Sequence, residues 1–102
     1  MLSYEQCAAL KAAGYPQTGA SLFCNEHGPL HEYEDAEACN GIPCPNSDEL
    51  IAVIQQKHPA VGGYVDIIAL AANLPHPEGG HYDYLLPALC ALYIALADGG
   101  RE

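Results

Sequence analysis

The longest uncharged apolar run is the feature that most limits how this sequence can fold. Residues 84–97 are fourteen consecutive positions without a charged side chain. A membrane-spanning helix needs about twenty such residues, so the run predicts a helix buried inside a folded domain. We expect it to begin near Asp83 and to end near Asp98, since a proline is tolerated in its first turn and a Gly-Gly pair follows it.

The predicted helix has two different apolar sides. One side carries a row of leucines at heptad-like spacing: Leu85, Leu89, Leu92 and Leu96. The other side is a smooth strip of alanines that a second backbone can approach closely: Ala88, Ala91 and Ala95. This pattern predicts a central helix that is covered on both sides within the domain. The alternative is that one side of the 84–97 helix forms a homodimer interface.

Two further helices are predicted from their capping residues. Ser3 and Gln6 fit a capping box at the start of the first helix. Asn46 and Glu49 fit the same arrangement at the start of the second. The second helix should end at His58, because a proline follows and the residue before proline avoids helical backbone angles.

The strands are less clearly marked. Residues 20–24 predict a short strand, and Leu30 with Tyr33 predict a strand that returns beside it. Residues 40–45 predict a loop, since they contain two prolines and a glycine. Residues 64–74 favour a strand because of their β-branched side chains and tyrosine, although their alanines favour a helix.

Together these elements predict one α+β domain over residues 1–102, with about three helices packed on a short antiparallel sheet and the last helix central. An all-α domain is the alternative if residues 64–74 are helical. A chain of 102 residues buries roughly two-thirds of its unfolded surface, which suffices for one modest core. The first residues have neither the basic start nor the long apolar run of a secretory signal, so we expect a cytoplasmic protein.

The charge balance excludes several classes of partner. Thirteen Asp and Glu residues stand against three Lys and Arg residues, for a formal net charge of −10. Binding to a nucleic-acid backbone needs basic side chains that displace counterions, and adhesion to anionic membranes needs them too. We therefore expect neither direct nucleic-acid binding nor membrane binding.

Three short segments occur in a familiar order. Residues 10–17 (LKAAGYPQ) are similar to an LKxAGFPQ opening, residues 42–43 and 47–51 (IP and SDELI) to an IP(T)LSELI helix start, and residues 91–96 (ALYIAL) to a closing AxLWLAL helix. In these segments the chain resembles a family of small uncharacterised phage and prophage proteins, from which it differs by three residues inserted after the Ile-Pro pair. The resemblance implies a small α+β domain carried on a mobile element, and it implies no reaction.

An acidic segment suggests what such a protein binds. Residues 26–49 contain no Lys or Arg. Their carboxylates are Glu26, Glu32, Glu34, Asp35, Glu37, Asp48 and Glu49. A solubilising surface is one interpretation. The functional interpretation is a decoy that imitates nucleic-acid phosphates and occupies a basic groove of a host protein, with Tyr33 as an aromatic anchor. Combined with the phage resemblance, this predicts a non-enzymatic, anti-CRISPR-like inhibitor of a host defence complex.

The cysteines and histidines offer a second hypothesis. Five cysteines in a cytosolic protein are free thiols or metal ligands more often than a disulfide framework. Two cysteines, Cys7 and Cys90, occur inside helical apolar patterns, so we expect them to pack as small hydrophobic residues. The predicted zinc ligands are Cys24, His27, Cys39 and Cys44. The alternatives are reduced cysteines with separate surface histidines, or a Cys39–Cys44 disulfide.

Enzyme signatures are missing from the sequence. It contains no Gly-x-Gly-x-x-Gly motif, no phosphate-binding loop and no Gly-x-Ser-x-Gly elbow. A His-x-Glu at residues 76–78 has no Pro-Cys-x-x-Cys downstream, so a zinc deaminase is rejected. We therefore predict no catalytic residues, no cofactor other than zinc, and no enzymatic activity. A small enzyme with a Cys–His pair is the second alternative.

Overall fold

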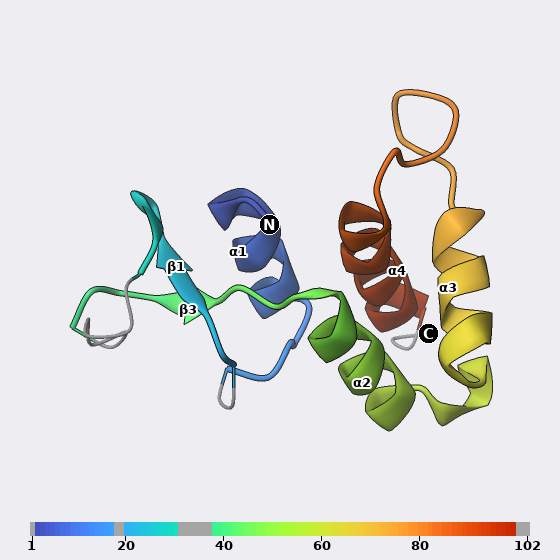
Figure 1. Cartoon of the computed structure of the whole chain (residues 1–102), viewed down its shortest axis with the longest axis horizontal. Helices are drawn as coiled ribbons and strands as arrows, with labels where there is room; N and C mark the ends of the chain where they lie inside the picture. Colours follow the sequence, from blue (N-terminus) through green and yellow to red (C-terminus); the bar gives the residue numbers. More distant parts are fainter. Residues whose placement is uncertain (1, 18–19, 31–37, 100–102) are drawn as a thin grey trace.

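One helix separates a small sheet from a group of three other helices (Figure 1). The computed structural model describes residues 2–17, 20–30 and 38–99. In chain order its elements are α1 (Tyr4–Ala12), β1 (Phe23–Asn25), β2 (Gly28–Pro29), β3 (Ile42–Pro43), α2 (Ser47–Lys57), the short 3-10 helix η1 (Pro59–Val61), α3 (Tyr64–Ala72) and α4 (Leu85–Gly99). The predicted α+β class is confirmed, but the described residues form four α-helices where three were expected.

The capping boxes predicted for α1 and α2 are both present. At α1, the Gln6 amide donates to Ser3 Oγ at 3.2 Å, and the Ser3 amide donates to Gln6 Oε1 at 2.9 Å. At α2, Asn46 and Glu49 exchange the equivalent bonds at 2.9 and 3.2 Å. Helix α2 ends at Lys57, and His58 is its C-cap directly before Pro59, so the predicted end is confirmed.

The sheet has β1 in its centre, with antiparallel neighbours in the order β2-β1-β3. The prediction of a loop over residues 40–45 is wrong at its centre, because Ile42 and Pro43 form β3. Pro43 is tolerated there because β3 lies at an edge of the sheet, where a strand does not need every amide. The returning strand is Gly28–Pro29, and the amide of Leu30 still donates to Phe23 O at 2.8 Å. Tyr33 lies outside the described residues.

The strand favoured for residues 64–74 is wrong, since this segment forms α3. Its start is capped from within, where the Gly63 amide donates to Asp66 Oδ2 at 3.0 Å. Ile67 and Ala71 lie four residues apart and are fully buried, which is helical spacing. The β-branched residues favour a strand, but the segment is helical because the side of α3 that carries Ile67 and Ala71 packs on α4 and α2.

Helix α4 is central, as predicted, and contacts each of the other three helices. It begins at Leu85, two residues later than expected. Leu89, Leu92 and Ala88 are buried, whereas Ala95 at the end of the alanine strip is exposed. Within the described residues no helix is long and apolar enough to span a membrane.

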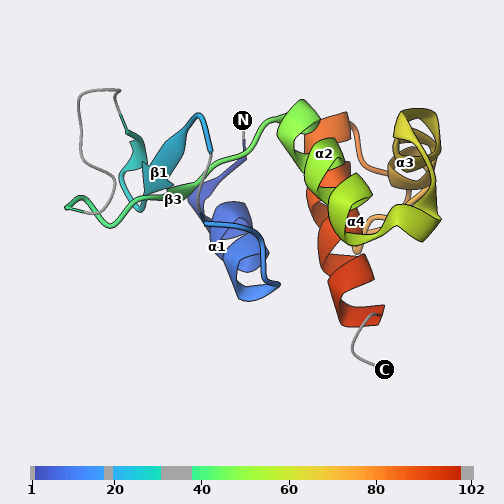
Figure 2. The ribbon, with the colours of Figure 1, turned by 90° about the horizontal axis from the view of Figure 1, so that it is seen from below.

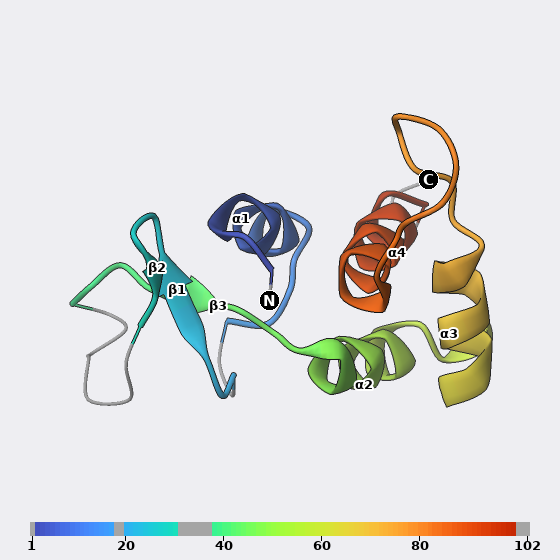
Figure 3. The ribbon, with the colours of Figure 1, turned by 45° about the horizontal axis from the view of Figure 1, so that its top comes forward.

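The molecule divides into an N-terminal part (residues 2–45) and a helical part (residues 46–99). Figures 2 and 3 show the sheet and α3 at opposite ends, with α1 between the sheet and α4. The two parts meet where the Tyr15 ring packs edge-on against Tyr93, with ring centroids 5.4 Å apart. Beside them, Lys57 Nζ donates to the Gly14 carbonyl at 2.7 Å and lies 5.8 Å from the centre of the Tyr93 ring.

Candidate metal centre

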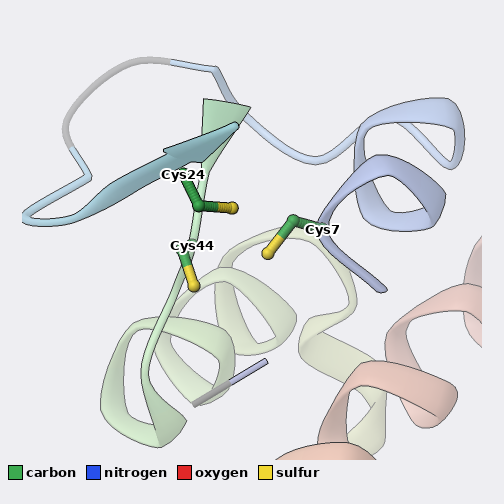
Figure 4. A group of neighbouring side chains, drawn as sticks. All are labelled: Cys7, Cys24 and Cys44. Carbon is green, nitrogen blue, oxygen red and sulfur yellow. The ribbon is translucent and has the colours of Figure 1, made fainter. Parts of the chain in front are cut away.

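Three cysteines from three different elements meet in the N-terminal part. Cys7 lies on the buried side of α1, Cys24 is the central residue of β1, and Cys44 directly follows β3. Their Sγ atoms all lie within 4.8 Å of one another, and the side chains surround one small region (Figure 4). We call this group the cysteine triad.

The local structure explains why these side chains meet. Cys24 pairs with Ile42 across the β1–β3 ladder, so the two side chains share one face of the sheet. Cys44 is two residues beyond Ile42, and its amide extends the ladder by donating to Leu22 O at 2.9 Å. Alternation along the strand therefore returns Cys44 to the face that carries Cys24. Helix α1 contacts β3 and places Cys7 opposite them.

The triad is enclosed by protein. The exposed fractions of Cys7, Cys24 and Cys44 are 1 %, 3 % and 2 %. All three are free thiols, and Cys44 Sγ donates to the Leu2 carbonyl at 3.7 Å. Their sulfurs are therefore shielded from water but remain close enough to share a ligand.

Burial keeps two of these thiols, Cys7 and Cys24, protonated when no metal is bound. It raises the pKa of Cys7 far above its ordinary value, and the neighbouring Cys44 and Cys24 thiols add to the effect. Burial also raises the pKa of Cys24. A metal ion reverses this preference, because its charge stabilises the thiolates and displaces the protons.

The spacing of the sulfurs suits a tetrahedral zinc site. With Zn–S bonds of about 2.3 Å, two thiolates on one zinc ion lie about 3.8 Å apart. The triad is within 4.8 Å, so its longest separation would shorten by no more than about 1 Å. Among the residues that the structure describes, the group consists of three ligands, so a tetrahedral site needs one further donor.

The structure brings together only half of the predicted zinc ligands. Cys24 and Cys44 belong to the triad, but His27 and Cys39 do not. His27 lies on the β1–β2 turn, where its side chain is 82 % exposed and its Nε2 lies 3.6 Å from a carboxylate oxygen of Glu26. Cys39 is half-buried, and its carbonyl accepts from Asn25 Nδ2 at 3.0 Å.

The residue that sequence analysis missed is Cys7. Its position three residues before Leu10 places it on the buried face of α1, which is why it was expected to be a packing residue. The expectation that Cys7 is buried is confirmed. Its partners come from the sheet, so the only sequence indication for Cys7 was the expectation that it is buried.

The acidic segment is only partly described. Glu32, Tyr33, Glu34, Asp35 and Glu37 lie outside the described residues.

The other three predicted partner-binding residues are placed. Glu26 and Asp48 are exposed. The Glu49 carboxylate is already engaged, since it accepts from the amide and hydroxyl of Ser21 at 3.3 and 3.1 Å and from the Asn46 amide. The decoy hypothesis therefore stays a prediction.

Comparison of the chain with protein-family models, with curated proteins and with solved structures finds no match. The resemblance to phage proteins consequently stays a prediction, and the functional argument depends on the chemistry of the triad.

Proposed function

We propose that this chain is a small zinc-binding module in which Cys7, Cys24 and Cys44 hold the ion. The observation that supports the proposal is the convergence of three buried thiols within 4.8 Å. Thiolates are the ligands that structural zinc sites use most, and soft sulfur ligands select zinc or Cu(I) over magnesium and calcium. This replaces the ligand set predicted from spacing, of which it keeps Cys24 and Cys44.

The proposed metal has a structural role. The strands of the N-terminal part have three, two and two residues, and so small a sheet has little stability of its own. A zinc ion bound by the triad ties α1, β1 and the segment after β3 to one point. Because a site of this kind does not exist in the unfolded chain, its binding free energy contributes directly to folding.

The enclosure of the triad also favours a structural site over a catalytic one. Catalytic zinc keeps an open position for water and substrate, whereas these cysteines are at most 3 % exposed.

Metal content and cobalt substitution test the proposal. We expect protein purified without added zinc to carry about one zinc ion per chain. Co²⁺ that replaces the zinc should give the sulfur-to-cobalt charge-transfer bands of a site with three thiolates. Cys7→Ser should abolish both results. Cys90→Ser is the matched control, because Cys90 is equally buried, at 3 % exposure, and lies outside the triad.

Two outcomes would overturn the proposal. One is wild-type protein that contains no zinc and shows no cobalt spectrum on titration. The other is retention of metal by Cys7→Ser together with its loss from Cys39→Ser, which would restore the ligand set predicted from the sequence. Since Cys7→Ser could also unfold the chain, ¹¹³Cd NMR of the wild-type protein counts the thiolates without any substitution.

A further inference from the structure

Helix α3 is apolar around almost its whole circumference. Asp66 is its only charged residue, and that carboxylate accepts from the Gly63 amide at the start of the helix. Ile67 and Ala71 face α4 and α2 and are fully buried. A helix that is apolar all round is normally covered all round.

The opposite side of α3 is not covered by any of the described residues. Val65, Ala69 and Ala72 follow one another at helical spacing, and all three are exposed. Val65 is 76 % exposed, and Tyr64 and Leu70 on either flank are 50 % and 45 % exposed. Figures 1 and 2 show α3 at the outer end of the molecule, with the other helices on one side only. We call this side the α3 outer face. Contiguous apolar surface of this kind marks interaction sites.

Charge argues against a second copy of the chain as the occupant of the α3 outer face. Nine helical residues span about 14 Å, which is the length of a short helix. A second copy would bring an equally small strip and a second net charge of −10. A single helix lying along α3 fits these dimensions better.

Charge specifies the chemistry of that helix. Helix α3 carries one carboxylate, Asp66, and no Lys or Arg, and the whole chain has a formal net charge of −10. An occupant with basic residues beside its apolar stripe is therefore attracted, and an acidic one is repelled. We propose that the α3 outer face binds an amphipathic, basic helix of a partner protein, which packs its apolar side against this face. This proposal does not depend on the metal centre.

A pair of synthetic peptides tests the proposal. The probe is a helical peptide of leucine and lysine with all leucines on one face, and its control has the same composition with the leucines distributed around the helix. Isothermal titration should show tighter binding of the amphipathic peptide to the wild-type protein. NMR shift changes should fall on the amides of α3.

Two substitutions that add the same charge separate apolar contact from electrostatic attraction. Ala69→Glu places a carboxylate in the α3 outer face and should weaken binding of the amphipathic peptide by about tenfold or more. Gln55→Glu adds the same charge at an exposed position of α2 and should leave binding equal or slightly tighter.

Three results of the peptide experiments would overturn the proposal. They are equal binding of both peptides, unchanged binding by Ala69→Glu, and NMR changes that fall away from α3. Sedimentation of the chain alone that revealed a dimer dissociated by Ala69→Glu would also overturn it, in favour of self-association. The NMR result on the wild-type protein stands even if Ala69→Glu folds poorly.

Discussion

The N-terminal part and the helical part are filled by different kinds of side chain. The buried hydrophobic residues of the N-terminal part are Leu2, Cys7, Leu10, Tyr15, Cys24, Ile42 and Cys44. Those of the helical part are Leu50, Ile51, Ile54, Ile67, Ala71, Ala88, Leu89, Cys90, Leu92 and Tyr93. Three of the seven in the first set are thiols, against one of the ten in the second.

This difference shows how one small chain can stabilise two parts by different means. The helical part buries long aliphatic side chains along three helices, and such burial contributes roughly 1.5–3 kcal/mol for each large side chain. The N-terminal part has short strands and few large apolar groups, so it needs a stronger local link. Small domains commonly supply that link with a disulfide or a metal, and the thiols of the triad are free.

The largest expected effect is the pH dependence of zinc affinity. The raised pKa values of Cys7 and Cys24 keep these thiols protonated near neutral pH. Zinc must displace these protons, so acidification weakens binding, by about a hundredfold for each pH unit if these two protons are released. Competition with a chromophoric chelator between pH 6 and 8 measures this. A pH-independent affinity would show that the triad does not supply the ligands.

A core substitution in the helical part should be costly whether or not zinc is bound. Leu89 is fully buried in α4, and Leu89→Ala should lower the free energy of unfolding by about 2–5 kcal/mol. Leu70→Ala, the same change at a residue that is 45 % exposed, should cost less than about 1 kcal/mol. Urea unfolding with and without chelator gives these values. A cost for Leu89→Ala that disappears on zinc removal would show that the helical part also depends on the metal.

The two capping boxes allow the same change in each part. Ser3→Ala at α1 and Asn46→Ala at α2 should each cost about 1 kcal/mol, because each removes the side chain that accepts a helix amide. Hydrogen exchange should show reduced amide protection in α1 for Ser3→Ala and in the helical part for Asn46→Ala. Ser47→Ala, one residue beyond the α2 cap, is the control and should change stability by less than about 0.5 kcal/mol. Equal loss of protection throughout the chain from both cap variants would mean that the parts unfold as one.

The smallest effect is expected at the junction of the two parts. The Tyr93 hydroxyl is buried and has no hydrogen-bond partner among the described residues. Tyr93→Phe removes an unpaired polar group and should leave stability unchanged or raise it by about 1 kcal/mol. Tyr93→Leu also removes the ring that packs on Tyr15 and should cost more than about 1 kcal/mol. Thermal unfolding measures both variants, and a loss with Tyr93→Phe would indicate a partner for the hydroxyl.

The elements that local interactions determine could be predicted from the sequence. Both capping boxes involve residues three apart, and the end of α2 depends on the proline that follows His58. The failures arose where distant contacts decide. Residues 64–74 are helical because Ile67 and Ala71 pack on other helices, and β3 exists only because β1 lies beside it.

The difference between local and distant contacts also explains which residues of the candidate site could be predicted. Spacing along the chain could suggest that Cys24 and Cys44 are ligands, but it also favoured His27 and Cys39, which stand nearby in sequence. Cys7 joins the group through packing of α1 on the sheet, at a separation of seventeen residues from Cys24. No local pattern encodes such a contact.

Hydrogen exchange before and after zinc removal tests the central claim most directly. The Cys44 amide, which donates to Leu22 O, reports on the N-terminal part, and the His58 amide, which donates to Ile54 O, reports on the helical part. The account predicts that both are protected with zinc, and that chelation releases the Cys44 amide while the His58 amide stays protected. Unchanged protection of Cys44 after complete removal of zinc would contradict it.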